Sequence, residues 1–300
     1  MTEKEKLMYD IISKISDMDV PIVFKGALIT KLILDEHGYK EIQRMTKDID
    51  ANWIGSPPSM SYLRNTISEA LGELNEKFDV EESREYGQGR SAGLAIRDKL
   101  TGDKVISMDI DIKSSSGARA YYYGEASIKG VLANDILADK ISTMSSDAVF
   151  KHRAKDMVDV YALTHCVKVD VKQIFDTCAR TGRNIQSFDS FFNRKADVEH
   201  AYNKLKGIEG KPPFATVYSY LSNFVVPFAK REIKSCIWNP QKKSWDSDEP
   251  QRIRLQDNSV PQEKRSSVLA DLKTIKAEQA QDKPDRSHQR SKTKSNNIEL

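Results

Sequence analysis

Two segments of this 300-residue sequence alternate like β-strands and carry two aspartates each. The first, RMTKDIDANW, places Asp48 and Asp50 two residues apart, and the second, VISMDIDIK, does the same with Asp109 and Asp111. Side chains at i and i+2 of a strand project from the same face, and aspartate is a poor strand former. Both segments therefore predict carboxylates gathered on one face of a sheet, with apolar residues on the other.

A bound cation accounts best for these carboxylates. Magnesium or manganese matches the pattern, because such an ion is held by a few carboxylate oxygens and its coordination is completed by substrate phosphates. The alternative is that both pairs face solvent at strand edges, where charges discourage aggregation. An EF-hand calcium loop starting at Asp48 does not fit, because its sixth position is Trp53 rather than glycine and its twelfth is Ser59 rather than glutamate.

The pattern around the acidic pairs predicts a mixed α/β fold. Apolar spacing over residues 7–15 predicts a helix, and PIVF before Gly26 predicts a buried strand followed by a glycine turn and a second helix. A further helix is predicted over residues 60–78, and a strand hairpin over residues 92–113. Later spacing is mostly helical, and the end of the chain is charged and poor in apolar residues. We therefore expect an α/β domain over residues 1–133, a helical domain over residues 134–240 and a disordered tail over residues 241–300.

Two further groups of residues are candidates for phosphate contacts. Gly26 puts the free amides of a helix N-terminus beside a strand end, an arrangement that suits a triphosphate, although it is also compatible with an ordinary turn. Lys140 lies among apolar residues at helical spacing, so it is either a phosphate ligand or a surface lysine with a buried stem. Asp156 and Asp159 lie one helical turn apart and can also form local salt bridges.

Composition narrows the class of protein without deciding its partner. The 47 basic and 44 acidic residues leave a net charge of +3, which neither demands nor excludes a nucleic-acid partner. Three widely spaced cysteines fit neither a disulfide framework nor a zinc site. The N-terminus is charged, and no apolar stretch approaches the roughly 18 residues of a membrane span. We therefore expect a cytoplasmic protein with no membrane partner.

The order of these features resembles a known family. A strand, glycine turn and helix are followed by RMTKDID, MDIDIK, ADK and RAKDMVDVY. Over roughly residues 20–230 this order resembles the AbiEii/AbiGii nucleotidyltransferase toxins of the polymerase-β-like nucleotidyltransferase superfamily. The resemblance implies a mixed sheet flanked by helices, followed by a helical domain that completes the active-site cleft. It also implies NMP transfer from an NTP to a hydroxyl of RNA, such as tRNA, or of protein, with release of pyrophosphate, by a toxin that a cognate antitoxin restrains.

The resemblance also implies roles for individual residues. The third acidic residue is either Asp109 or Asp111, and Asp109 is preferred. One departure is that Ala27 and Leu28 stand where the family commonly has a second small residue followed by a hydroxyl residue, with Thr30 one turn further on. The implied metal ligands are Asp48, Asp50, Asp109 and Asp111, and the implied catalytic residues are Asp48, Asp50, Asp109, Lys140 and Asp159. The implied nucleotide-binding residues are Lys25, Gly26, Ala27, Lys140 and Asp156. A basic surface for RNA would consist of Lys151, Arg153, Lys155, Arg180 and Arg183.

Two other interpretations compete with this one. A metal-dependent glycosyltransferase also uses a DxD motif to bind a nucleotide diphosphate, but it explains neither the glycine before the early helix nor the later Lys/Asp helices. A catalytically inactive module that binds RNA or a partner could keep the same fold, and the altered glycine motif favours it. The presence of all the acidic residues argues against it.

Overall fold

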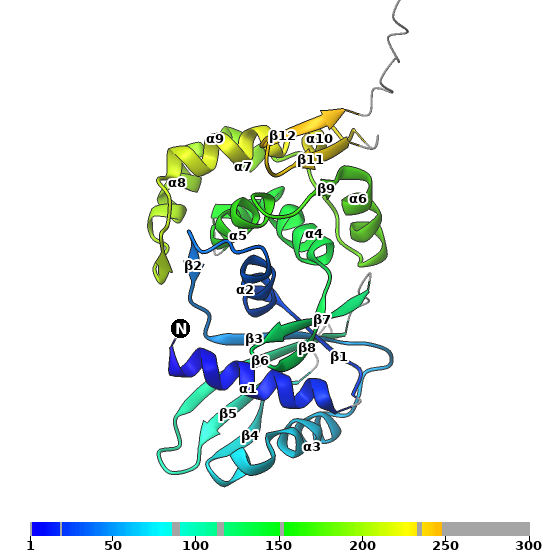
Figure 1. The fold of residues 1–300 in the computed structure, drawn as a ribbon, viewed down its shortest axis with the longest axis vertical. Coiled ribbons are helices and arrows are strands. Elements are labelled where there is room, and N and C mark those ends of the chain that lie inside the picture. The colour runs from blue at the N-terminus through cyan, green and yellow to red at the C-terminus, as the bar shows by residue number, and fades with distance from the viewer. Residues whose placement is uncertain are drawn as a thin grey trace, which may run out of the picture. The chain divides into compact units, whose positions relative to one another are not determined.

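The structure, a computed structural model, describes most of the chain up to residue 247 (Figure 1). The described residues belong to one compact unit, residues 1–249. No helix in this described part is long and apolar enough to cross a membrane. Most of the predicted tail lies outside the described residues, which are 2–18, 20–85, 91–112, 117–150, 153–232 and 236–247.

A seven-stranded mixed sheet is the centre of the unit. Its strands β3 (Asp48–Trp53) and β6 (Lys104–Ile112) are parallel, as are β1 (Ile22–Lys25) and β8 (Ala126–Val131), and every other neighbouring pair is antiparallel. The predicted hairpin is confirmed as β5 (Ser91–Asp98) and β6, and the predicted strand before Gly26 as β1. The order across the sheet is β4 (Phe78–Arg84), β5 (Ser91–Asp98), β6 (Lys104–Ile112), β3 (Asp48–Trp53), β1 (Ile22–Lys25), β8 (Ala126–Val131) and β7 (Ala118–Tyr123).

The pairing of β3 with β6 brings the two acidic segments side by side. Asp50 lies opposite Asp109, and Asn52 lies opposite Asp111. Paired residues of neighbouring strands project from the same face, so the carboxylates gather on one side as predicted. The residues between them are fully buried on the other side: Ile49, Ala51, Met108 and Ile110.

Helices cover both faces of this sheet. On the apolar face lie α1 (Glu3–Asp17) and α3 (Met60–Leu71), and on the carboxylate face lie α2 (Gly26–Glu36), α4 (Ala133–Met144) and α5 (Lys155–Thr164) (Figure 1). Helix α1 begins with a capping box, in which Thr2 and Glu5 exchange hydrogen bonds, and this satisfies amides at the helix N-terminus.

The prediction of one helix over residues 60–78 was wrong at its C-terminal end. The α-helix ends at Leu71 because Gly72 takes a positive φ of 53°, and a 3-10 helix, η1 (Gly72–Glu76), follows. Phe78 and Val80 alternate with exposed residues and bury their side chains as part of the edge strand β4. From Phe78 onward, burial of every second side chain in the sheet therefore determines the structure, rather than the helical spacing of the apolar residues.

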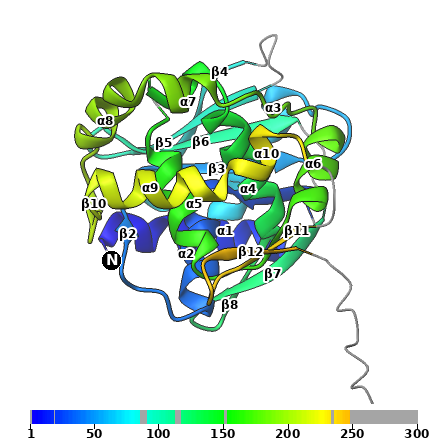
Figure 2. The same ribbon diagram turned by 90° about the horizontal axis from the view of Figure 1, so that it is seen from above.

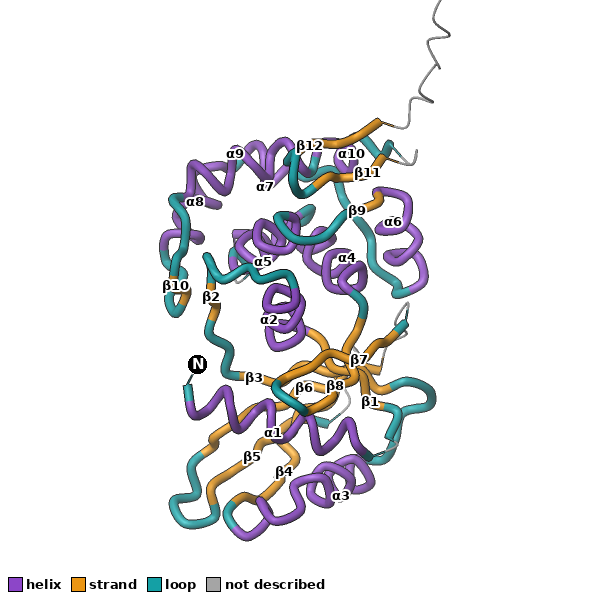
Figure 3. Tube along the Cα trace, in the orientation of Figure 1, coloured by secondary structure: helices purple, strands orange, loops and turns teal. Residues whose placement is uncertain are grey.

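Helices predominate in the second half of the described chain (Figure 3). This agrees with the mostly helical spacing of the sequence, but short strands are also present and pair with distant segments, and Figure 2 shows them beside the helices. The α-helices are α6 (Val171–Arg180), α7 (Asp189–Asn193), α8 (Lys195–Asn203), α9 (Phe214–Phe224) and α10 (Val226–Ala229), with a 3-10 helix η2 (Asp147–Phe150). The short strands are β2 (Gln43–Arg44) paired with β10 (Ile208–Glu209), and β9 (Val169–Asp170), β11 (Cys236–Asn239) and β12 (Ser244–Ser247) in a three-stranded sheet.

Residues 241–247 were predicted to begin the disordered tail, and this boundary was wrong. The strand β12 pairs with β11 in an antiparallel hairpin. Trp245 stacks on Phe224 with ring centroids 5.3 Å apart, and its indole nitrogen donates a 3.1 Å hydrogen bond to the Phe224 carbonyl. Large aromatic side chains supply enough burial to order a short segment whose other residues are polar.

Candidate active site

A pocket of about 260 Å³ opens on the carboxylate face of the sheet, where it is lined by residues of β1, β3, β6, α2, α4 and α5. Val131 and Ile136 supply a small apolar part of its wall. The other lining side chains are mostly charged, with basic and acidic groups mixed. Such a lining suits a charged ligand that carries both anionic groups and a cation, rather than an apolar molecule.

Gly26 brings a helix N-terminus against a carboxylate in this pocket. The chain passes from β1 into α2 at Gly26, whose φ of 71° favours glycine. A Cβ at this position would lie 2.9 Å from the Asp50 Cγ and overlap its Oδ2. No side chain caps the first turn of α2, so its amide groups stay open to a ligand. The structure therefore gives the predicted glycine a specific reason: nothing larger fits between the helix and Asp50.

The predicted acidic residues separate into two groups. Asp50 and Asp111 line the pocket, whereas Asp48 and Asp109 are not among the lining residues. Asp48 is exposed at the start of β3. Asp109 forms a 2.7 Å ion pair with Arg84, and both side chains are about half exposed. Asp111 thus lines the pocket with Asp50, whereas Asp109 lies directly opposite Asp50 in the strand pairing, so the choice of the third acidic residue stays a prediction.

Lys25 occupies the space beside these two carboxylates. Its Nζ lies 2.6 Å from the Asp111 Oδ2, with both side chains largely buried. Burial raises the pKa of Asp50 above its usual value, and the Lys25 ammonium opposes that rise. Lys25 is thus a positive charge inserted at the acidic face of the pocket.

Asn52 is a pocket residue that the sequence reasoning missed. It stands two residues after Asp50 on β3, is 4% exposed and lines the pocket. Its Oδ1 is buried and makes no hydrogen bond to any described residue. An unsatisfied buried acceptor costs about 1–3 kcal/mol, so this oxygen is an available ligand site. The signal in the sequence was the continued alternation DIDAN, in which Asn52 shares the face of the two aspartates.

The later lysine and aspartates form a buried charge network. The Lys140 ammonium lies 2.6 Å from Asp159 and 3.1 Å from Asp156, and all three residues are at most 5% exposed. Arg44 of β2 donates two hydrogen bonds to Asp159, at 2.9 and 3.0 Å. These contacts join α4, α5 and β2 into one wall of the pocket, and Arg44 is a member that the sequence did not suggest.

The charges in this network stabilise one another. Burial by itself would raise the pKa of Asp159, but Lys140 and Arg44 outweigh burial and hold that pKa at about 2. Burial likewise disfavours the charged form of Lys140, but Asp156 and Asp159 raise the lysine pKa above its usual value. Asp159 therefore remains a carboxylate with a weak affinity for protons.

A second network lies at the rim. Burial would raise the pKa of Asp139, but Arg183, whose Nε donates a 2.7 Å hydrogen bond, is the main cause that lowers it to about 2. Arg153 lies 2.7 Å from Asp156 and 3.7 Å from Asp139. Thr30, considered in place of the missing hydroxyl residue, donates instead to the Gly26 carbonyl at 2.9 Å within α2.

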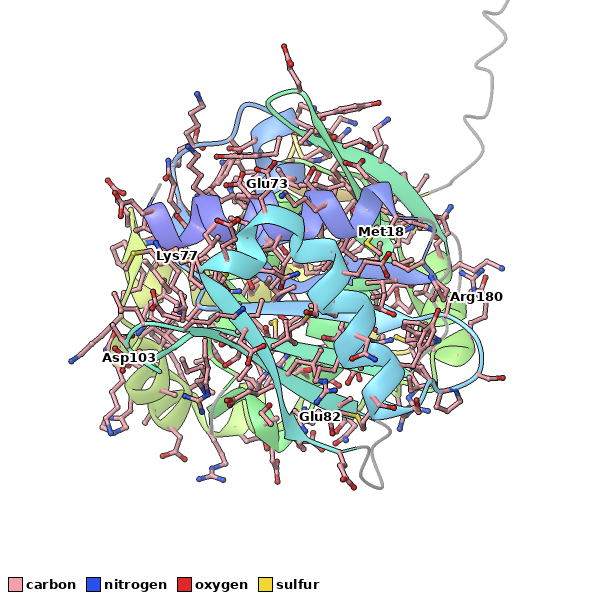
Figure 4. The ribbon with its side chains drawn as sticks, turned by 90° about the horizontal axis from the view of Figure 1, so that it is seen from below. Met18, Glu73, Lys77, Glu82, Asp103 and Arg180 are labelled. Carbon is pink, nitrogen blue, oxygen red and sulfur yellow. The ribbon has the colours of Figure 1, made fainter. Side chains whose placement is uncertain are left out.

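The basic residues suggested for RNA are divided between different places. Arg153, Lys155 and Arg183 line the pocket, and Ala27 joins Lys25 and Gly26 in its wall. Arg180 is exposed at the end of α6 and is labelled at the edge of Figure 4. The remaining one, residue 151, lies outside the described residues.

The pocket residues fit a magnesium ion that arrives with a phosphate ligand. Across the described ranges, no three His, Cys, Asp or Glu side chains are placed to hold a metal by themselves. Magnesium is commonly bound through one or two carboxylates, with water and substrate phosphates as the other ligands. Asp50, Asp111 and the unsatisfied Oδ1 of Asn52 offer only oxygen atoms, which are the donors that magnesium prefers.

The family model described as "Nucleotidyl transferase AbiEii toxin, Type IV TA system" matches residues 7–217. No curated protein matches the sequence. Among solved structures, JHP933 from Helicobacter pylori is 14% identical with a TM-score of 0.47, and the alignment covers 77% of this chain and 96% of that one. The nucleotidyltransferase toxin MenT4 from Mycobacterium tuberculosis is also 14% identical, with a TM-score of 0.40 and coverage of 77% and 91%.

Proposed function

The chain belongs to the AbiEii family of nucleotidyltransferase toxins of type IV toxin–antitoxin systems, and from this premise we propose the reaction that its pocket performs. The protein transfers an NMP from an NTP to a hydroxyl of RNA, such as a tRNA end, or of a protein. It acts in the cytoplasm, where a cognate antitoxin restrains it. The observation that carries the proposal is the contact of the α2 N-terminus with Asp50, because it places anion-binding amides beside a carboxylate on one pocket wall.

Binding of the triphosphate is the first task of these residues. The open amides of Gly26 and Ala27 accept phosphate oxygens at the helix N-terminus. Lys25 and Lys155 line the same pocket and add positive charge. Lys140 supports this wall through its pairs with Asp156 and Asp159, so it acts on the nucleotide through the position of α4 and α5.

Transfer needs the acceptor hydroxyl to approach the α-phosphorus in line with the leaving pyrophosphate. The new bond joins the acceptor oxygen to phosphorus while the bond to the bridging oxygen breaks, and a pocket carboxylate receives the hydroxyl proton. Asp50 and Asp111 would hold magnesium or manganese, which supplies charge neutralisation at the phosphates. The roles of Asp48 and Asp109 as further ligands stay predictions, and single substitutions test them.

The experiment supplies the purified protein with each of four α-labelled NTPs, magnesium, and separate RNA and protein fractions of a bacterial extract. We expect label to enter one fraction with wild type, and the labelled fraction identifies the acceptor class. Asp50→Asn should lose this transfer. The matched control is Asp103→Asn, because Asp103 is exposed in the turn between β5 and β6, at the periphery of Figure 4.

The outcome decides between the proposed activity and the alternatives. Transfer by wild type and by the Asp103 variant, but not by the Asp50 variant, supports nucleotidyl transfer in this pocket. No transfer with any NTP, together with transfer of labelled sugar from a nucleotide-sugar to an acceptor in the extract, would replace the proposal by the glycosyltransferase. Failure of every triphosphate and magnesium to raise the melting temperature would leave an inactive binding module.

A further inference from the structure

The strongest unexplained feature of the pocket is the side chain of Asn52. The side chain is only 4% exposed, and its Oδ1 has no hydrogen-bond partner among the described residues. It also lines the pocket, so the unsatisfied oxygen is available to a ligand there rather than to bulk solvent. A buried acceptor in a polar pocket indicates a ligand that brings either a hydrogen-bond donor or a cation.

The neighbours of Asn52 indicate which of the two it is. Asn52 lies directly opposite Asp111 in the parallel pairing of β3 and β6, and Asp50 precedes it by two residues on the same face. Two carboxylates and an amide oxygen on adjacent strands form a set of acceptors that calls for positive charge. No three Asp, Glu, His or Cys side chains are placed to hold a metal anywhere in the described ranges, this pocket included, so a third protein ligand beside Asp50 and Asp111 would be the amide oxygen of Asn52.

Lys25 already supplies positive charge to this place. Its ammonium lies 2.6 Å from Asp111 and is the main opposite charge acting on Asp50. It extends from the last residue of β1, which pairs with Asp50. A lysine and a divalent ion cannot both occupy the same gap between carboxylates, because the two cations repel each other and compete for the same oxygens.

We infer that Asp50, Asn52 and Asp111 together form a divalent-cation subsite, and that Lys25 occupies it when no nucleotide is bound. The inference rests on the proposed nucleotidyl transfer and deepens it, because it assigns a third ligand and an internal competitor. Entry of the cation frees the Lys25 ammonium, which can then contact the triphosphate that accompanies the metal. Cation and nucleotide consequently bind together more tightly than either binds alone.

Direct binding of Mn²⁺ to the nucleotide-free, full-length protein tests this inference without using activity. Titration followed by electron paramagnetic resonance measures free Mn²⁺. We expect Lys25→Met to raise the Mn²⁺ affinity at least about tenfold, and Asn52→Leu in that background to lower it at least about tenfold, because loss of a metal ligand has effects at least as large as loss of its supporting groups. Asn52→Asp in the same background should strengthen binding, since it replaces a neutral oxygen by a charged one.

Matched controls separate these effects from general changes in charge or folding. Lys129→Met removes an exposed lysine of β8, and Asn65→Leu makes the same change of side chain on the exposed face of α3. Both should leave the Mn²⁺ affinity unchanged. Thermal unfolding without metal shows that each variant is folded, and Asn52→Leu should retain or raise the melting temperature because it removes an unsatisfied buried acceptor.

The results distinguish failure of this inference from failure of the proposed function. Equal Mn²⁺ affinity of Lys25→Met with and without Asn52→Leu overturns the subsite, and so does a Lys25→Met variant that binds no Mn²⁺. If the wild type nevertheless transfers label from an NTP, nucleotidyl transfer stands without it. The expected Mn²⁺ pattern with no transfer supports the cation subsite and removes the proposed reaction.

Discussion

Substitution of Gly26 by alanine tests whether the contact between α2 and Asp50 is what makes the pocket. Two effects are expected from the structure. The positive φ of 71° costs a residue with a Cβ about 1–2 kcal/mol, and the new methyl group overlaps the Asp50 carboxylate. Asp50 is short and largely buried, so its carboxylate can avoid the methyl group only by leaving its place beside the helix N-terminus. We expect at least about a tenfold loss of NTP affinity, equivalent to about 1.4 kcal/mol.

Gly38 provides the control for backbone strain alone. It follows α2, has a φ of 66°, and an added Cβ there would meet nothing within 4 Å. Gly38→Ala should therefore lose about 1–2 kcal/mol of unfolding free energy in urea and keep its NTP affinity. Each kcal/mol corresponds to a fall of about 2–4 °C in melting temperature for a unit of this size. If Gly26→Ala binds NTP and magnesium in titration calorimetry as tightly as Gly38→Ala, the reasoning about Asp50 is wrong.

The remaining predictions concern the buried charge network. Lys140→Met leaves Asp156 and Asp159 buried without their shared lysine, so urea unfolding should show a loss of about 3–5 kcal/mol, whereas the exposed control Lys172→Met should show no measurable loss. The pKa of Asp159 is about 2 in the folded protein and 3.8 in the unfolded chain, so the folded protein binds this proton more weakly. Its stabilisation of about 2 kcal/mol is therefore complete above about pH 5 and disappears as the pH falls through 2. Asp159→Asn should flatten that part of the stability profile, and an unchanged acid limb would contradict the assignment.

The fold class and the shared face of the acidic segments could be predicted because both depend on local periodicity. Alternation in DIDANW and VISMDIDI sets the face of each residue wherever the strand pairs, and the mixed sheet flanked by helices confirms the fold that the resemblance implied. The boundary at residue 241 could not be predicted, because Trp245 is ordered by Phe224, which is 21 residues earlier in the chain. The end of α3 was missed because burial of Phe78 against the sheet depends on a partner strand.

The sequence by itself determined the residue types of the site and the strand and helix that present them. Gly26 had to precede a helix and Asp50 had to share a face with Asn52, because these relations follow from chain geometry over a few residues. Tertiary structure alone decided that Asp111 rather than Asp109 lines the pocket, and that Arg44 joins a network with Lys140 and Asp159. The reason is physical: register and ion pairing depend on which distant segments pack together, and burial gives a charge its partner only after the chain has folded.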